Sequence, residues 1–212
     1  MSFMSNSSFP GRDGNINIQL SRSYKFLTEP SWVHNSPTSS GIVYMIVSGD
    51  RRARDGMRDL WTSHIANPDQ RHVFLVPDDG SEALKRETDD HDDIVSVNVH
   101  SADIHYEHKM SLLALLWSYQ HCPQCEATIL LRDNVFVNTG AMRRLLDRHK
   151  YESNRVYGVM YKYYTPARDK TAKHFINKED WPWSMYPPFL DPHVLIFTQD
   201  TLPTILHHSS QG

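Results

Sequence analysis

The sequence predicts a single α/β domain with a mostly parallel central sheet flanked by helices. Short apolar runs alternate with segments of helical periodicity of about 10–15 residues, which is the pattern of βαβ units. The length of 212 residues suits one sizeable domain. Residues 1–40 are rich in Ser, Asn, Gly and Pro, so we expect a flexible stem or lead-in there and the domain over residues 41–212.

Six apolar runs, each bounded by polar or turn residues, are predicted as strands. In chain order they cover residues 42–47, 72–76, 94–99, 129–131, 156–164 and 194–198. The first, Ile42–Val47, is a dense β-branched run that ends at the turn signal Ser48-Gly49-Asp50. The fourth run is purely aliphatic, as expected of a central strand whose two faces are both buried.

The segments between these runs repeat apolar residues at helical spacing. Helices are expected at residues 51–65, 81–90, 109–121, 141–150 and 202–207. Met57 and Trp61 share one stripe of the first helix, and Pro123 stops the third. We expect the mixed charges of residues 81–90 to form a solvated face, and the acidic run Asp89–Asp93 to be a charged turn before the next strand.

Composition excludes several classes of protein. A net charge of −3 argues against nucleic acid as the main partner, because phosphate binding leaves a strongly basic footprint. No apolar run approaches the roughly 20 residues that a membrane helix needs, and no signal-peptide pattern is visible. A phosphate-cradling glycine loop, a dinucleotide fingerprint and a nucleophile elbow are all absent from the sequence.

A polar triplet, Arg132-Asp133-Asn134, follows the predicted central strand directly. In open α/β sheets, ligands bind in the crevice beyond the carboxyl ends of the strands. Asp133 is the one carboxylate of the triplet, and the guanidinium of Arg132 beside it opposes cation binding. The triplet is therefore either a working ligand site or the remains of one.

Residues 166–189 have little periodicity but many Trp, Tyr and Pro residues, which predicts a long shaped loop over the sheet. Within it, the run Trp181–Phe189 has the most unusual composition of the chain. Flat aromatic rings suit the apolar faces of sugars, and they also serve as ordinary core. Composition leaves both readings open.

Cys122 and Cys125 form a C-x-x-C pattern at the end of a predicted helix. Redox chemistry of the thioredoxin type needs this motif at the start of a helix, where the helix dipole lowers a thiol pKa. A zinc site needs a second ligand pair at matching spacing, and the sequence has none. We therefore expect a structural role, with the thiols buried or joined in a disulfide.

Several motifs occur together in one order. They are Arg54, Met57, Arg58 and Trp61; Asp93-Ile94-Val95; Trp117 and Cys122; Leu130 to Asn138; Arg168-Asp169, Lys173 and Phe175; and Trp181-Pro182 with Tyr186-Pro187-Pro188-Phe189. In this order and at these distances they resemble the β-1,3-galactosyltransferase family (glycosyltransferase family 31). The resemblance covers roughly residues 42–206.

The resemblance implies a glycosyltransferase-A-like fold and a hexosyltransferase. Such an enzyme would transfer galactose or N-acetylglucosamine from a UDP-sugar to a glycan acceptor in β-1,3 linkage, with inversion, in protein glycosylation. Family members are type II membrane proteins of the Golgi, which implies the Golgi lumen, although residues 1–212 contain no anchor. The implied cofactor is Mn²⁺, held by an acidic triplet.

Carried over position by position, the family motifs imply three sets of site residues. The donor-binding set is Arg54, Arg58, Arg132, Asp133 and Lys173. The border of the acceptor or sugar site is Trp181, Tyr186, Pro187 and Phe189. The metal position is Asp133 and Asn134.

This sequence departs from the family where the chemistry lies. Arg132 and Asn134 replace two carboxylates of the metal-binding triplet, and Arg132 offers a fork that suits diphosphate oxygens directly. The E-D-V segment, which supplies the general base in the family, has no counterpart in residues 1–212, so the sequence assigns no catalytic base. The alternative function is a catalytically inactive relative that binds a glycan or a partner protein.

Overall fold

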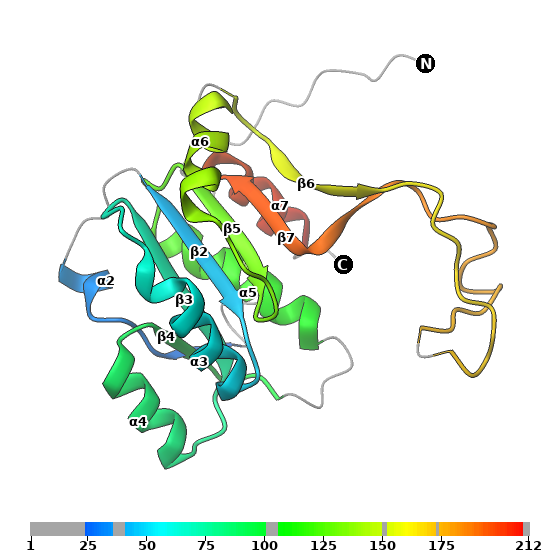
Figure 1. The fold of residues 1–212 in the computed structure, drawn as a ribbon. Helices are drawn as coiled ribbons and strands as arrows, with labels where there is room; N and C mark the ends of the chain where they lie inside the picture. The colour runs from blue at the N-terminus through cyan, green and yellow to red at the C-terminus, as the bar shows by residue number, and fades with distance from the viewer. Residues whose placement is uncertain (1–23, 36–40, 101–105, 150–151, 173, 210–212) are drawn as a thin grey trace.

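The computed structural model describes residues 24–35, 41–100, 106–149, 152–172 and 174–209 (Figure 1). Its strands are β1 Phe26–Thr28, β2 Ile42–Val47, β3 Gln70–Pro77, β4 Ile94–Val97, β5 Ala127–Arg132, β6 Val156–Tyr161 and β7 Phe189–Thr198. Its α-helices are α2 Trp32–Asn35, α3 Arg51–Leu60, α4 Glu82–His91, α5 Tyr106–His121, α6 Thr139–His149 and α7 Leu202–Ser209. Short 3-10 helices cover Thr62–His64 and Gln199–Thr201.

One sheet organises these elements, with the strand order β1-β4-β3-β2-β5-β7-β6. The central strands β4, β3, β2 and β5 are parallel to one another. Strands β1 and β7 run the opposite way, and β6, antiparallel to β7, runs with the central four. The prediction of a mostly parallel sheet is confirmed, with the antiparallel strand β1 added at one edge and the antiparallel hairpin of β6 and β7 at the other.

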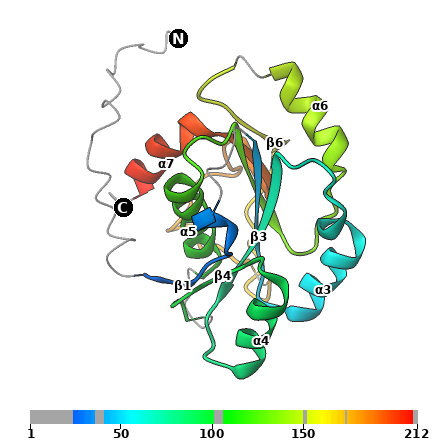
Figure 2. The ribbon, with the colours of Figure 1, turned by 90° about the vertical axis from the view of Figure 1, so that its left-hand side faces the viewer.

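Helices cover both faces of the sheet (Figure 2). Alternate residues of a strand point to opposite faces, so β2 is buried on both sides and contributes to two cores. Met45 packs with Trp117 of α5 and Leu206 of α7 on one face. Tyr44 packs with Trp61 after α3 on the other, the face that α6 also covers. The predicted single α/β domain is confirmed.

The N-terminal prediction does not hold for residues 24–35. Within the range expected to be a flexible lead-in, strand β1 pairs with β4, with Phe26 opposite Val97. Trp32 of α2 then packs edge-on against Trp117, with 6.0 Å between ring centroids. Three aromatic side chains, Tyr24, Phe26 and Trp32, together with Val33, thus pack this segment against the core.

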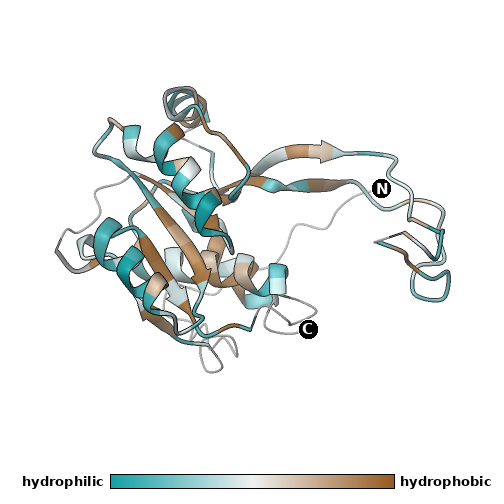
Figure 3. Cartoon of the chain, turned by 60° about the horizontal axis from the view of Figure 1, so that its bottom comes forward, coloured by the Kyte–Doolittle hydropathy of each residue, from teal (hydrophilic) through white to brown (hydrophobic). Residues whose placement is uncertain are grey.

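The connection between β6 and β7 lies elsewhere than the sequence predicts. Val194–Thr198 of β7 pairs with β5, whereas Phe189 and Leu190 pair with β6 alone. The far part of this hairpin and its connecting loop project beyond the sheet (Figures 1 and 3). We call residues 159–172 and 174–193 the arm. The prediction that this loop lies over the sheet is therefore wrong. Its aromatic rings pack on one another rather than on the core.

None of the helices in the described ranges has the length and apolar character needed to cross a membrane.

Candidate active site

The carboxyl ends of β2 and β5 meet at one edge of the sheet, because the two strands are parallel neighbours. There the Ser48 hydroxyl donates a hydrogen bond of 2.8 Å to Oδ2 of Asp133. Arg54 of α3 approaches the same hydroxyl, with 3.4 Å between Nη1 and Oγ. The predicted site residue Asp133 is thereby fixed to β2, at the edge where α/β folds bind ligands.

Arg132 ends β5 beside Asp133. Its Nη2 lies 3.4 Å from a carboxylate oxygen of Glu107, whose side chain is 74% exposed. Glu107 belongs to helix α5, which begins at Tyr106. The Tyr106 hydroxyl lies near Gly49, just after β2, and burial raises the pKa of this phenol above the usual value. A long, exposed ion pair of this kind contributes little stability, so the Arg132 guanidinium is available to a ligand at this edge.

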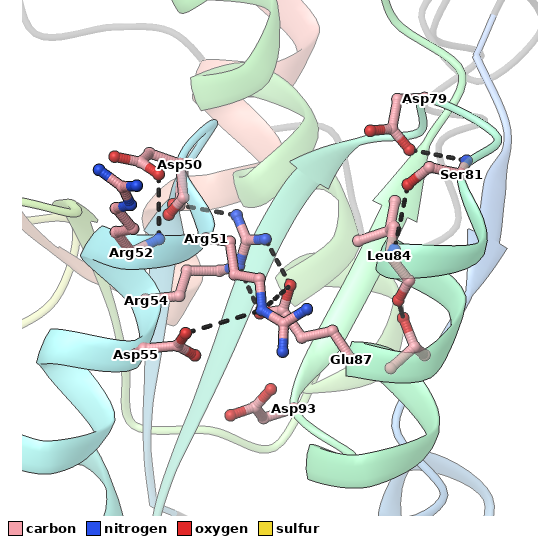
Figure 4. Close-up of polar contacts among 12 residues, drawn as sticks. Asp50, Arg51, Arg52, Arg54, Asp55, Asp79, Ser81, Leu84, Glu87 and Asp93 are labelled. Atoms are coloured by element: carbon pink, nitrogen blue, oxygen red, sulfur yellow. Dashed lines mark hydrogen bonds and ion pairs between the residues drawn. The ribbon is translucent and has the colours of Figure 1, made fainter.

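Arg54 and Arg58, predicted to contact the donor nucleotide, have their charges paired inside the protein. Nε and Nη2 of Arg54 donate to both carboxylate oxygens of Glu87, at 2.8 and 2.7 Å, across from α3 to α4 (Figure 4). Arg58 donates to both oxygens of Asp93 at 2.8 Å and to Glu87 at 2.9 Å. Both arginines are 5% exposed or less. In this structure they join α3 to α4 and β4, and a direct donor contact stays a prediction.

The expectation that residues 81–90 present a solvated charged face is wrong for Glu87, which is only 1% exposed. Burial alone would raise the pKa of Glu87, but hydrogen bonds from Arg54 and Arg58 outweigh it and hold that pKa below its usual value. The same balance, with Arg58 and His72 as donors, lowers the pKa of Asp93. Both carboxylates stay ionised at neutral pH.

The residues at the triplet do not fit a manganese site. Mn²⁺ prefers several carboxylate or carbonyl oxygens, and the triplet supplies one carboxylate, Asp133, with Arg132 as an opposing positive charge. In the part of the chain that the structure describes, no three His, Cys, Asp or Glu side chains lie together as metal ligands. The predicted pair Asp133 and Asn134 is therefore too small a ligand set. Lys173, the other predicted donor residue, lies outside the described residues.

The four predicted border residues do come together, on the arm. With Tyr164, which the sequence analysis missed, they line an open apolar hollow of about 400 Å³. The lining is Tyr164, Trp181, Tyr186, Pro187 and Phe189. The ring of Tyr186 lies 5.3 Å from that of Trp181 and 6.4 Å from that of Tyr164, centroid to centroid. Aromatic rings around an open hollow suit the flat apolar face of a sugar.

Sequence analysis also missed a histidine–carboxylate pair on β7. Nδ1 of His193 lies 2.6 Å from Oδ1 of Asp191, and the Tyr161 hydroxyl donates to Oδ2 of Asp191 at 2.7 Å. The backbone N–H of His193 also donates to Asp191, and these hydrogen bonds lower the pKa of Asp191 to about 2. The only sequence signal is the spacing Asp-x-His, which is too common to single out.

Cys122 and Cys125 lie just after α5, and both are buried thiols that do not form a disulfide. The hydrogen bond that the Cys125 thiol donates to Cys122, together with burial, raises the pKa of Cys125. A buried thiol that resists ionisation is a poor nucleophile, which agrees with the expected structural role.

Comparison with known proteins identifies the family. The family model described as Galactosyltransferase matches residues 52–212. The mouse (Mus musculus) protein named beta-1,3-galactosyltransferase 5 is 26% identical over 167 residues, which cover 75% of this chain and 54% of the mouse protein. The Xenopus laevis protein named lactosylceramide 1,3-N-acetyl-beta-D-glucosaminyltransferase A is 25% identical over 76% of this chain and 46% of that protein.

The chain thus spans about half the length of these two curated relatives. Among solved structures, a 4-diphosphocytidyl-2C-methyl-D-erythritol synthase aligns with a TM-score of 0.40 and 8% identity, over 79% of this chain and 78% of that chain. The family model matches well over half of the chain, including the triplet at the end of β5 and the whole arm. The chain belongs to the galactosyltransferase family.

Proposed function

We propose that the protein is a hexosyltransferase that moves galactose or N-acetylglucosamine from a UDP-sugar to a glycan acceptor. The observation that carries the proposal is the course of β7. Its middle residue Val194 pairs with Leu131 of β5, directly before Arg132, and its first residue, Phe189, lines the aromatic hollow. A charged edge for a diphosphate and an aromatic surface for a sugar are thus linked by a single strand.

In this proposal the donor diphosphate binds Arg132 directly, without a metal ion. The guanidinium fork pairs with two phosphate oxygens at once, and it lies where the family has a carboxylate of the metal-binding triplet. The Asp133 carboxylate, which accepts a hydrogen bond from Ser48, would also accept hydrogen bonds from hydroxyl groups of the ribose or the transferred sugar. A β-1,3 linkage, inversion at the anomeric carbon and a place in protein glycosylation in the Golgi lumen are parts of the same proposal, supported by family membership.

Isothermal titration of UDP tests the donor site. We expect the wild-type protein to bind UDP equally well in Mn²⁺ and in EDTA. Arg132→Ala should weaken binding about 10- to 100-fold, since a hydrogen bond between charged groups contributes about 1.5–3 kcal/mol. Arg155→Ala is the matched control, because Arg155 is 59% exposed and precedes β6, where Val156 pairs with the far end of β7. Binding that requires Mn²⁺ and survives Arg132→Ala would refute the metal-free site.

The second candidate is a relative that binds glycans without transferring sugar, and the reduced triplet favours it. Radiolabelled transfer from UDP-galactose or UDP-N-acetylglucosamine to a panel of p-nitrophenyl glycosides distinguishes the two functions. Sugar transfer by the wild-type protein that is abolished in Asp133→Ala supports the hexosyltransferase function. Tight glycan binding without transfer from either donor supports the binding protein.

A further inference from the structure

The orientation of the Asp133 side chain is set by a neighbouring strand. The N–H of Val135 donates to the carbonyl of Arg132 at 3.3 Å, so Asp133 and Asn134 form the middle of a tight turn directly after β5. A turn fixes the backbone of its central residues but not their side-chain rotamers. The Ser48 hydroxyl, just after β2, supplies that constraint by donating to Oδ2 of Asp133 at 2.8 Å. Ser48 thus selects one orientation of the carboxylate.

Ser48 is itself rigidly held. It is 1% exposed, and its N–H donates to the carbonyl of Leu75 on β3 at 3.0 Å, which continues the ladder between β2 and β3 beyond Val47. A hydroxyl this deeply buried meets little competition from water, and hydrogen bonds are stronger in such low-dielectric surroundings. The group that orients Asp133 is therefore fixed to the centre of the sheet.

Arg54 restricts the direction in which the Ser48 hydroxyl can donate. Nη1 of Arg54 approaches Oγ of Ser48 at 3.4 Å, while Nε and Nη2 of the same guanidinium donate to Glu87. A guanidinium only donates hydrogen bonds, whereas a hydroxyl has one proton to donate and two lone pairs that accept. The oxygen of Ser48 therefore accepts from Arg54, and its single proton points to another partner.

Two acceptors compete for the Ser48 proton. The carbonyl oxygen of Asp50 lies 3.2 Å from Oγ, and Oδ2 of Asp133 lies 2.8 Å from it. The Asp50 carbonyl already accepts the N–H of Arg54 at the start of α3. A carboxylate is the stronger acceptor, because charged partners make shorter and stronger hydrogen bonds. The proton is therefore directed to Asp133.

The second oxygen of Asp133 is left for a ligand. The residue is half-buried, and in the described part of the chain no hydrogen-bond donor reaches its Oδ1. A side chain that is already held in its bound orientation loses less conformational freedom when a ligand arrives, which strengthens binding. The contact with Ser48 therefore prepares Asp133 to accept a hydrogen bond through Oδ1.

We propose that Ser48 is a positioning residue for the sugar donor, holding Asp133 by Oδ2 so that Oδ1 accepts hydroxyl groups of the UDP-sugar. This inference rests on the proposed hexosyltransferase function, in which Asp133 binds the donor. The buried Arg54, itself held by Glu87, serves the same site through Ser48 and needs no direct contact with the donor.

A double-mutant cycle on donor affinity tests the positioning role. Isothermal titration measures the Kd of UDP-galactose and of UDP-N-acetylglucosamine for the wild type, Ser48→Ala, Asp133→Ala and the double variant. The buffer contains Mn²⁺, so that the result does not depend on whether a metal takes part. Asp133→Ala should weaken binding about 10- to 100-fold, and Ser48→Ala about 3- to 10-fold. The double variant should bind no more weakly than Asp133→Ala, because Ser48 acts only through that carboxylate.

Ser118→Ala is the matched control. Ser118 is also fully buried, and its Oγ lies 2.6 Å from Oγ1 of Thr128, the second residue of β5, at the opposite end of that strand from Asp133. This variant should lose stability without a change in Kd. Wild-type affinity in Ser48→Ala, or a loss that persists in the Asp133→Ala background, overturns the role of Ser48 alone. A wild type that binds neither donor, or whose Kd Asp133→Ala leaves unchanged, overturns the proposed donor site as well.

Discussion

Gly41 stands where three segments of the chain meet at the amino end of the sheet. Its carbonyl accepts the N–H of Glu126 at 2.7 Å, and the N–H of Ile42 donates to the carbonyl of Asp69 at 2.8 Å. A Cβ atom at position 41 would lie 1.9 Å from that Asp69 oxygen. Backbone atoms cannot move aside as the end of a flexible side chain can, so this position excludes any larger residue.

Gly41→Ala should therefore lower the free energy of unfolding by about 2–3 kcal/mol or more, as overpacking does. Urea denaturation measures the change. Gly56→Ala is the control, since Gly56 lies within helix α3 with no atom near its added Cβ. That variant should gain about 0.5–1 kcal/mol, because glycine weakens a helix interior. Equal effects of the two substitutions would show that the contact at Asp69 is unimportant.

At the scale of elements, the arm is held in shape by Arg168. Its guanidinium donates to the carbonyls of Ile176 at 2.8 Å, Trp181 at 2.5 Å and Trp183 at 3.0 Å. These carbonyls belong to the loop that supplies Trp181 to the hollow. Arg168 thus closes the loop behind the hollow, together with hydrogen bonds such as that from the Tyr186 N–H to the Tyr164 carbonyl.

Arg168→Ala should loosen the loop without unfolding the domain, because loops open locally at a lower free energy than the core. We expect faster amide hydrogen exchange over residues 176–186 and unchanged exchange in β2 and β5, measured by mass spectrometry. Lys170→Ala, an exposed change nearby, should alter neither region. A large fall in Tm for Arg168→Ala would mean that the arm and core unfold together.

The elements also show what the sequence could predict. The central strands were predictable because each is a continuous apolar run with both faces buried, as in Ile42–Val47. Strand β1 was not, since Phe26–Thr28 is three residues long and exists only through its pairing with β4. Strand β7 begins five residues before its prediction because Pro192 suggests a break. In the structure Pro192 lies in a bulge of β7, residues 191–194 opposite Val159 of β6, where no ladder bond is needed.

The candidate site was predictable to a similar degree. The change from apolar to polar residues predicted Asp133 at the carboxyl end of β5, and the structure has it there, bonded to Ser48. Its part in ligand binding stays a prediction. The partners of Arg54 and Arg58 were not predictable, because their pairing depends on how α3 packs against α4 and β4. The local sequence predicts burial and periodicity, but it does not predict which charged side chains form ion pairs between two helices.

At the scale of the whole molecule, the pairs of Arg54 and Arg58 with Glu87 and Asp93 make stability depend on pH. The folded pKa values of Glu87 and Asp93 lie below their ordinary values of 4.5 and 3.8. Their contribution is therefore fully present above about pH 4.5 and is lost as the pH falls toward the folded values. Acid should separate α3 from α4 and β4, since protonation leaves two arginines buried without ionised partners.

Glu87→Gln should lower the free energy of unfolding by about 3–5 kcal/mol at pH 7, the cost of breaking a buried ion pair from one side. It should also flatten the acid limb of Tm against pH between about pH 5 and 3, followed by circular dichroism. Glu82→Gln, exposed in the first turn of the same helix, should cost less than about 1 kcal/mol. Identical acid limbs for the wild type and Glu87→Gln would refute this origin of the pH dependence.

The bulge at residues 191–194 gives β7 two separate registers. On one side Val194–Thr198 is fixed against β5, and on the other Phe189 and Leu190 are fixed against β6 alone. Residues gained or lost within the arm therefore leave β5 and its triplet in place. The length and sequence of the arm, and with them the aromatic hollow, can therefore change while Arg132 and Asp133 keep their place at the end of β5.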